Sequence, residues 1–235
     1  YSFLVWQSLT LALPSLPEGA RVSIRPRVVA LGRGLAALAN RDGTLPHLGD
    51  ADDAVLLVYP PRAIALPQHP LWAFASEAGS ASQPRRHLPG YGVTRLTRGA
   101  TEVVFKWDNP PTRDGASPHV HDDILQTILR FNDRDVLLDG GTFSYTEDPD
   151  LRQALRSPRG HNAPQVDGPS SGRSLSTFRW RRVPRGEALS PPENDTCIAS
   201  GRRSDDRVTR HVMLLDDGLV LIADLVRGAS ETCWR

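Results

Sequence analysis

A change in hydrophobic periodicity near residue 90 constrains the fold more than any other feature of this sequence. Before it, apolar residues recur at the spacing of a helix. After it, short runs rich in valine, threonine and aromatic residues alternate with turn residues. The segment between, "SEAGSASQPRRHLPG" at 76–90, is rich in glycine, serine and proline and is typical of a linker. The sequence therefore predicts a helical part followed by a part built of strands.

Helices are predicted within residues 1–75. Apolar residues fall near one face over 1–13, and prolines at 14 and 17 end that helix. A second helix is expected over 26–39, where a proline stands near the start and leucines form one stripe. A third helix start, at 54–72, is interrupted by two consecutive prolines.

An antiparallel β-sandwich is predicted over residues 91–235. The runs "YGVTRLTRG" and "TEVVFKW" read as a hairpin joined at Gly-Ala, and Asp217-Gly218 marks a further tight turn. Another hairpin is expected around "NDRD" at 132–135, with Asp133-Arg134 as its two-residue turn. Strands at such short, regular intervals are typical of a sandwich.

Composition excludes some classes of partner. Hydrophobic residues make up 39% of the 235 residues, enough for a core, and the net charge of +1 gives no reason to expect a nucleic acid. No apolar stretch approaches the length of a membrane-spanning helix. Lys106 is the only lysine among 28 basic residues. The forked guanidinium of arginine suits carboxylates and sulfates, although a GC-rich genome also favours arginine.

Three histidines and an aspartate form the candidate site. In an extended segment, His119, His121 and Asp123 would point to one face, and such ligands suit zinc. Asp139, which precedes Gly-Gly, and His161 follow at a distance. In an ideal hairpin with the predicted turn, however, His121 would lie further along its strand than the residue opposite Asp139. The separation would be roughly 23 Å, at about 3.3 Å per residue. Spacing alone leaves a metal site and a set of solvated polar residues equally open. A cupin-like metal site is disfavoured, because the glutamate it requires shortly after the second histidine is missing.

The same residues resemble the heparinase II/III family of polysaccharide lyases. The resemblance rests on "HVHDD" at 119–123, on "LLDGGTFSY" at 137–145, and on "RS", "HN" and "VDG" between 156 and 168. It implies β-elimination on a polysaccharide that contains uronic acid. In that reaction a base removes the C5 proton, an acid protonates the departing O4, and the sugar carboxylate is neutralised.

The resemblance also implies roles for individual residues. His119 matches the catalytic histidine, and His121, Asp139 and His161 match the ligands of members that hold a zinc ion. Tyr1 matches a catalytic tyrosine near the start of a helix, although an ordinary helix-terminal tyrosine is an equal reading. Arg156 is expected to bind a sugar carboxylate or, equally, a neighbouring aspartate.

Two further positions are expected to be structural. Tyr145 is expected to pack its ring at a turn, and Asp50 and Asp52 to order the loop in which they stand.

The resemblance implies a larger architecture as well. Residues 1–75 would be the remnant of a helical toroid, 76–90 a linker, and 91–235 a C-terminally incomplete sandwich. The substrate would be an acidic polysaccharide, and the location periplasmic or extracellular. Alone, these residues are expected to bind glycan weakly and to show little lyase activity. The rival hypothesis is a non-catalytic glycan-binding sandwich that keeps its metal as a structural element.

Overall fold

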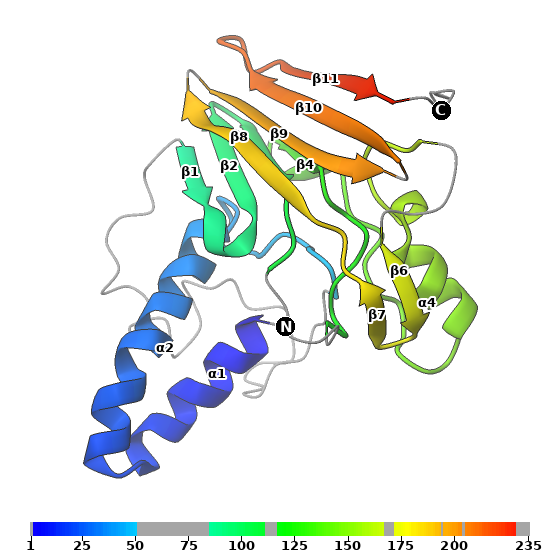
Figure 1. Ribbon diagram of the computed structural model, residues 1–235. Helices are drawn as coiled ribbons and strands as arrows, with labels where there is room; N and C mark the ends of the chain where they lie inside the picture. The colour runs from blue at the N-terminus through cyan, green and yellow to red at the C-terminus, as the bar shows by residue number, and fades with distance from the viewer. Residues whose placement is uncertain are drawn as a thin grey trace. The chain divides into compact units, whose positions relative to one another are not determined.

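The computed structural model describes residues 2–50, 85–110, 117–166, 172–193, 195–203 and 205–228 (Figure 1). These form two compact units. The first comprises 1–46 with 52–83, and the second comprises 47–51 with 84–235. The expected helix start at 54–72 lies outside the described residues. None of the described helices is long and apolar enough to cross a membrane.

Two helices that pack against each other make up the described part of the first unit. They are α1, Ser2–Ala12, and α2, Glu18–Leu38, joined by a short 3-10 turn at Leu13–Ser15. Trp6, Val28 and Leu35 are buried between them. This pairing follows from the apolar stripes of the two helices, each of which needs a partner surface.

The predicted start of the second helix was wrong by eight residues. The helix begins at Glu18, directly after Pro17, and Pro26 lies inside it. A proline inside a helix loses its bond to the carbonyl four residues earlier. Here that residue is Val22, which is 67% exposed, so water can compensate for the lost bond.

The second unit is the predicted antiparallel sandwich, which Figure 1 shows as two stacked sheets. One sheet has the order β1-β2-β3-β4-β5 and the other β11-β10-β9-β8. The strands of the first sheet are β1, Arg85–Leu88; β2, Val93–Arg98; β3, Thr101–Lys106; β4, Gln126–Phe131; and β5, Arg134–Leu137. Those of the second are β8, Gly186–Glu193; β9, Thr196–Arg203; β10, Asp206–Leu214; and β11, Val220–Arg227.

The core lies between these sheets. Leu96 and Phe105 contribute from the first sheet, and Ala199, Val208 and Val212 from the second. All are at most 3% exposed. The alternation of buried and exposed residues along β10 is the period-2 pattern of a strand with one face on a core.

A small two-stranded sheet and a helix complete the second unit. The sheet pairs β6, Arg173–Ser176, with β7, Arg179–Arg182, and the helix α4 spans Pro149–Arg156. Beyond residue 90 this is the only α-helix among the described residues, and it has eight residues. β1 lies at 85–88, inside the segment expected to be a linker, so strand structure starts earlier than expected.

The register of one hairpin differs from the prediction by one residue. Phe131 pairs with Arg134, so Asn132 and Asp133 form the turn. Both have positive φ values, 50° and 59°, which match the type I′ turn that suits the twist of a hairpin. Asparagine and aspartate tolerate this left-handed conformation better than other non-glycine residues.

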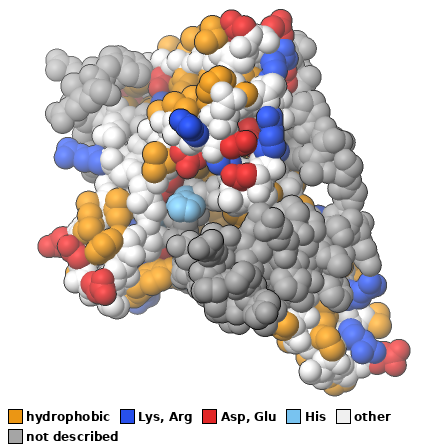
Figure 2. All heavy atoms as spheres, turned by 180° about the vertical axis from the view of Figure 1, so that it is seen from behind, with side chains coloured by type: hydrophobic (Ala, Val, Ile, Leu, Met, Phe, Trp, Pro, Cys, Tyr) orange, Lys and Arg blue, Asp and Glu red, His pale blue; other side chains and the backbone are white. Residues whose placement is uncertain are grey.

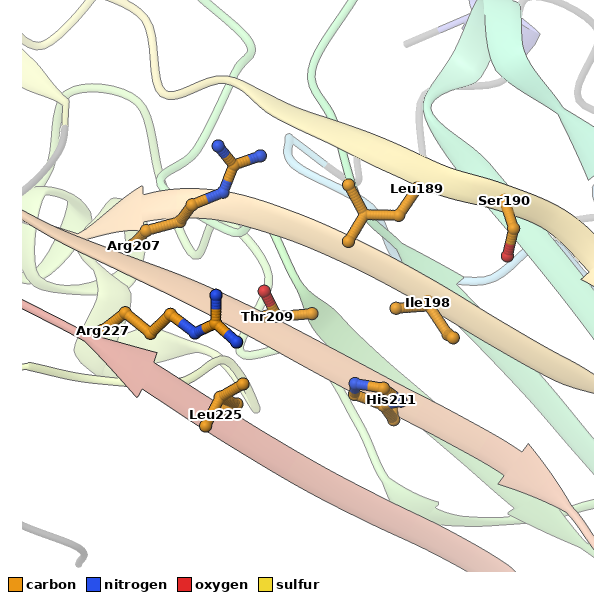
Figure 3. A pocket seen from close by; sticks show the side chains of 8 residues that line it. All are labelled: Leu189, Ser190, Ile198, Arg207, Thr209, His211, Leu225 and Arg227. Carbon is orange, nitrogen blue, oxygen red and sulfur yellow. The ribbon is translucent and has the colours of Figure 1, made fainter.

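The outer surfaces of the sandwich carry mixed charge. On the face in Figure 2, acidic and basic side chains of the described residues lie interspersed, in agreement with the net charge of +1. The outer face of β8–β11 has an open hollow of about 630 Å³, lined by Leu189, Arg207, His211 and Arg227 among others (Figure 3). The candidate residues of the histidine cluster do not line it.

Candidate catalytic and metal site

The candidate site is built on an irregular segment, residues 117–125, that precedes β4. The strand begins only at Gln126, and Leu125 adopts a positive φ of 63°. A leucine is strained in this conformation, so packing must hold it, and Leu125 is fully buried in the core. The ideal-strand estimate that separated His121 from Asp139 therefore does not apply.

Two buried ion pairs hold this segment on the sandwich. Asp123 accepts a hydrogen bond from Lys106 at the end of β3, and Asp122 accepts one from Arg203 at the end of β9. All four side chains are at most 6% exposed. Removing one partner from such a pair would leave a buried charge without compensation, so each pair favours the observed position of the segment. Asp123 therefore faces Lys106 and does not join the histidines as a ligand.

Hydrogen bonds to backbone carbonyls fix the segment further. Trp180 Nε1 donates to the carbonyl of Val120 at 3.0 Å, and Asn109 Nδ2 donates to that of His121 at 3.1 Å. The guanidinium of Arg156 stacks 4.7 Å above the Trp180 ring and donates to the carbonyls of Ser176 and Thr177. The histidine side chains thus project from a backbone held on several sides.

Two glycines bring the other candidate ligands to the same place. Gly140 N donates to Gly160 O at 3.3 Å, and a Cβ on Gly140 would lie 2.9 Å from that oxygen. Only a residue without a side chain allows this approach. Since Asp139 precedes Gly140 and His161 follows Gly160, the contact places the carboxylate beside the imidazole.

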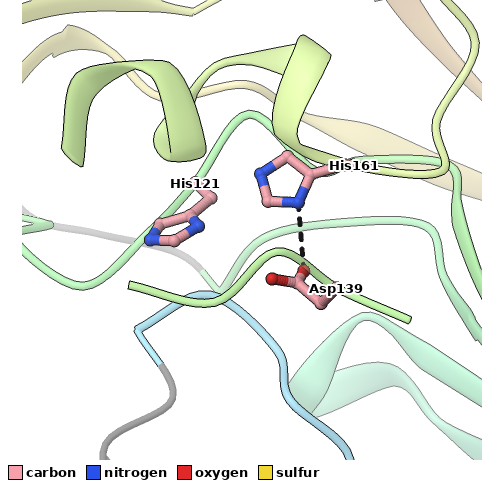
Figure 4. Close-up of side chains that lie close together, drawn as sticks. All are labelled: His121, Asp139 and His161. Atoms are coloured by element: carbon pink, nitrogen blue, oxygen red, sulfur yellow. Dashed lines mark hydrogen bonds and ion pairs between the residues drawn. The ribbon is translucent and has the colours of Figure 1, made fainter. Parts of the chain in front are cut away.

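His121, Asp139 and His161 converge, as predicted (Figure 4). Each offers one ligand atom, these atoms lie within 4.8 Å of one another, and all three residues are buried. The two imidazole rings have centroids 5.3 Å apart. Asp139 Oδ2 lies 3.0 Å from His161 Nδ1 and 2.8 Å from Gln126 Nε2.

The hydrogen bonds of the two histidines indicate which nitrogen of each ring carries the proton when no metal ion is bound. His121 Nε2 and His161 Nδ1 each face a carboxylate, so they carry the protons. His121 Nδ1 and His161 Nε2 are buried and have no hydrogen-bond partner. Two buried imidazole nitrogens without partners are costly unless a ligand takes them. Two imidazoles and the Asp139 carboxylate are a donor set that fits zinc, and an ion held by Asp139 and His161 together would replace the proton between Asp139 Oδ2 and His161 Nδ1.

Burial and hydrogen bonding set the charge of these ligands. Burial is the largest influence on the His121 ring and lowers its pKa, which favours the neutral form that binds metals. Burial would raise the pKa of Asp139, but hydrogen bonds from His161, Gly141 and Gln126 outweigh it and hold the pKa below its usual value. Asp139 is therefore ionised.

Asp50 joins both parts of the site. Its Oδ2 lies 2.8 Å from His119 Nδ1, and its Oδ1 lies 2.8 Å from His121 Nε2. Arg152, on α4, forms a bidentate pair with the same carboxylate at 2.9 Å for each bond. Burial would raise the pKa of Asp50, but the hydrogen bonds from His119, His121 and Arg152 outweigh it and hold the pKa far below its usual value.

His119 is the partly exposed member of this group. Its side chain is 29% exposed, whereas those of Asp50 and His121 are fully buried. The Tyr145 ring meets the His119 ring edge-on, with centroids 6.2 Å apart, and stacks on Arg152. The Tyr145 ring therefore packs against both His119 and Arg152.

Two other predicted site residues have different outcomes. Arg156 is fully buried, and its guanidinium bonds backbone carbonyls, which favours a structural role over contact with a sugar. Burial and the nearby charge of Arg152 lower its pKa to about 10, so it stays charged near neutral pH. Tyr1 lies outside the described residues.

Sequence reasoning missed the central position of Asp50 and the presence of Arg152. It assigned Asp50 to ordering its own loop, but its partners lie 69 to 102 residues away in the chain. No local pattern reports such contacts. In the sequence only the glycine before Asp50 hints at a close approach; in the structure Gly49 has a φ of +65°, and its Cβ would lie 2.7 Å from His119 O.

Comparison with known proteins agrees with this architecture. Residues 80–232 match the family model described as Heparinase II/III-like, C-terminal. No curated protein matches the chain in sequence.

Solved structures show the same fold at low sequence identity. A heparinase III described as the BT4657 gene product has a TM-score of 0.59 and 16% identity. The heparan sulfate lyase HepC from Pedobacter heparinus has a TM-score of 0.60 and 18% identity. Each match covers 92% of this chain and 34% of the other, so the chain spans about a third of the length of these proteins. Because the family model covers well over half of the chain, the chain belongs to the heparinase II/III-like family, and residues 80–232 are its C-terminal domain.

Proposed function

We propose that this chain is part of a polysaccharide lyase that cleaves uronic-acid-containing glycans by β-elimination. One observation carries the proposal. His119 is partly exposed, bonds a buried carboxylate through Nδ1, and stands two residues from a group of potential metal ligands in a heparinase II/III-like domain. The substrate is an acidic polysaccharide, and the enzyme works in the periplasm or outside the cell, as the family resemblance implies.

His119 is proposed to transfer the proton at C5 of the uronate. With its proton at Nδ1 held by Asp50, Nε2 is the basic nitrogen that can accept a proton from the sugar. Proton removal next to a carboxylate is easier when the carboxylate is neutralised by a positive charge or a hydrogen-bond donor. Tyr1 remains the candidate for the acid that protonates O4.

His121, Asp139 and His161 are proposed to hold a divalent ion, zinc by the chemistry of the donors. Such an ion supplies a fixed positive charge that orders the histidine segment. The chain's own contribution is the rigid positioning of His119 next to this group. Arg156 is proposed to support the segment through the carbonyls that it bonds.

The test is a panel of uronate polymers offered to the full-length protein that carries these residues. Heparan sulfate and alginate belong in the panel, and the readout is the absorbance of the unsaturated sugar formed by elimination. The proposal expects such a product from at least one polymer. Binding of a polymer without any unsaturated product would contradict it and favour a non-catalytic glycan-binding domain.

A further inference from the structure

We propose that Asp50 is a positioning residue that fixes the tautomers of both His119 and His121. It holds the proton of His119 on Nδ1 and the proton of His121 on Nε2. The inference deepens the proposed function and rests on it for the role of His119. It starts from one carboxylate whose two oxygens contact two different imidazoles, each at 2.8 Å.

The carboxylate can only accept hydrogen bonds. Arg152 donates to both of its oxygens at 2.9 Å, and a guanidinium keeps its charge at any physiological pH. Thr142 Oγ1 contacts Oδ1 at 3.3 Å. The side chains of Asp50 and Arg152 are fully buried, so the pair is shielded from water. An ionised carboxylate in this position requires that each neighbouring imidazole nitrogen carries a proton.

The two protons then lie on different ring positions. His119 faces Asp50 through Nδ1, whereas His121 faces it through Nε2. In the neutral rings, the lone pairs are therefore at Nε2 of His119 and at Nδ1 of His121. His121 Nδ1 is the buried nitrogen without a hydrogen-bond partner in the ligand group. The Asp50 carboxylate thus leaves a lone pair on His119 that can accept a proton and a lone pair on His121 that can bind a metal ion.

The backbone around Asp50 supports this arrangement. Asp50 N donates to His119 O at 3.0 Å, and the absence of a side chain at Gly49 allows the approach. Gly49 and Asp50 are therefore held against the histidine segment by a main-chain hydrogen bond as well. A variant that changes only the carboxylate can keep this contact.

Asp50→Asn is the discriminating variant. An amide offers one acceptor oxygen and one donor NH₂, so it cannot accept hydrogen bonds from both histidines, which contact different atoms of the group. One of the two rings must change its tautomer or lose its hydrogen bond. The matched control is Glu102→Gln, which alters another buried carboxylate with an arginine partner, Arg95, on the neighbouring strand β2.

Nitrogen NMR of the metal-free protein gives the first readout, at about pH 8, above the ordinary imidazole pKa of about 6.5. We expect Nδ1–H for His119 and Nε2–H for His121 in the wild type and in Glu102→Gln. In Asp50→Asn at least one of the two patterns changes. The wild-type spectrum tests the proposal without any variant: a proton on His119 Nε2 or His121 Nδ1 would overturn it, even if Asp50→Asn does not fold.

Zinc affinity and kinetics give the second readout. Asp50→Asn is expected to weaken zinc binding by about 10–100-fold, the usual loss when an orienting partner is removed. It should lower kcat more than it changes KM. Unchanged tautomers and zinc affinity in folded Asp50→Asn would overturn the inference while leaving the lyase proposal intact. The expected tautomers in a protein that makes no unsaturated product would refute the lyase proposal instead.

Discussion

At the scale of single residues, the site is defined by which nitrogen of each histidine forms a hydrogen bond to a carboxylate. Carboxylates accept hydrogen bonds from His121 Nε2 and His161 Nδ1. The other nitrogen of each ring is buried and lacks a hydrogen-bond partner. This asymmetry distinguishes the pair from histidines that merely fill a core. It cannot be read from sequence, because it depends on carboxylates 71 and 22 residues away.

Zinc binding should depend on both histidines of the ligand group. Replacing His161 by Ala removes a ligand, so the zinc affinity should fall by at least the roughly 10–100-fold typical of a lost outer-shell partner. Zinc should also raise the Tm of the wild type, because a ligand that binds only the folded state stabilises it. Calorimetric titration and thermal unfolding measure both effects.

His211→Ala is the control for this measurement. His211 is on β10, in the hollow on the outer face of its sheet and outside the ligand group (Figure 3). Its loss should leave the zinc affinity unchanged. Equal zinc affinity in His161→Ala and the wild type would remove His161 from the metal site.

At the scale of elements, the sequence predicted strands and helices better than it predicted their contacts. Runs rich in valine, threonine and aromatic residues identified the β2–β3 hairpin, because such residues favour strands. The start of α2 was missed, since Pro26 was taken as a boundary although it lies in the helix interior. The turn after β4 was misplaced by one residue, because several turn-forming residues stand in a row.

The convergence of the ligands was predicted from the family resemblance and against the ideal-strand estimate. The estimate assumed that the strand continues back to His121. In the structure β4 begins only at Gln126, and Leu125 before it has a left-handed backbone. Neither has a sequence signal, because leucine rarely adopts that conformation. The positions of His121, Asp139 and His161 were therefore predicted correctly, while the partners that orient them were not.

The packing of the Gly49 segment on the histidine segment gives a stability prediction. Gly49→Ala adds strain at a φ of +65° and places a Cβ 2.7 Å from His119 O, so it should cost more than backbone strain alone. Gly99→Ala is the matched control, with a φ of +54° and no atom within 4 Å of the added Cβ. We expect roughly 1 kcal/mol for Gly99→Ala and about 2–4 kcal/mol for Gly49→Ala.

Urea unfolding measures both variants. Because the clash involves the backbone of His119, Gly49→Ala should also disturb the His119 nitrogen signals, and Gly99→Ala should not. Equal losses of stability in the two variants would contradict the close approach of Gly49 to the carbonyl of His119.

At the scale of the whole molecule, the described residues contribute one of the groups that the proposed reaction needs, the His119 imidazole. The sandwich unit carries His119 and the ligand group, and the chain spans 34% of the length of the solved heparinases. β-Elimination needs a base, an acid and a neutralising group around one sugar, and positioning supplies much of the rate. Residues 1–235 alone are therefore expected to bind glycan weakly and to turn over little of it.

The most direct test of the account is the lyase activity of full-length His119→Ala on a polymer that the wild type cleaves. Formation of the unsaturated product should fall by roughly 100-fold or more, as expected when a general acid–base group is removed. The His211→Ala enzyme should keep the wild-type rate, and zinc should still bind to His119→Ala. A His119→Ala enzyme that makes unsaturated product at the wild-type rate would contradict the central claim that His119 transfers the proton.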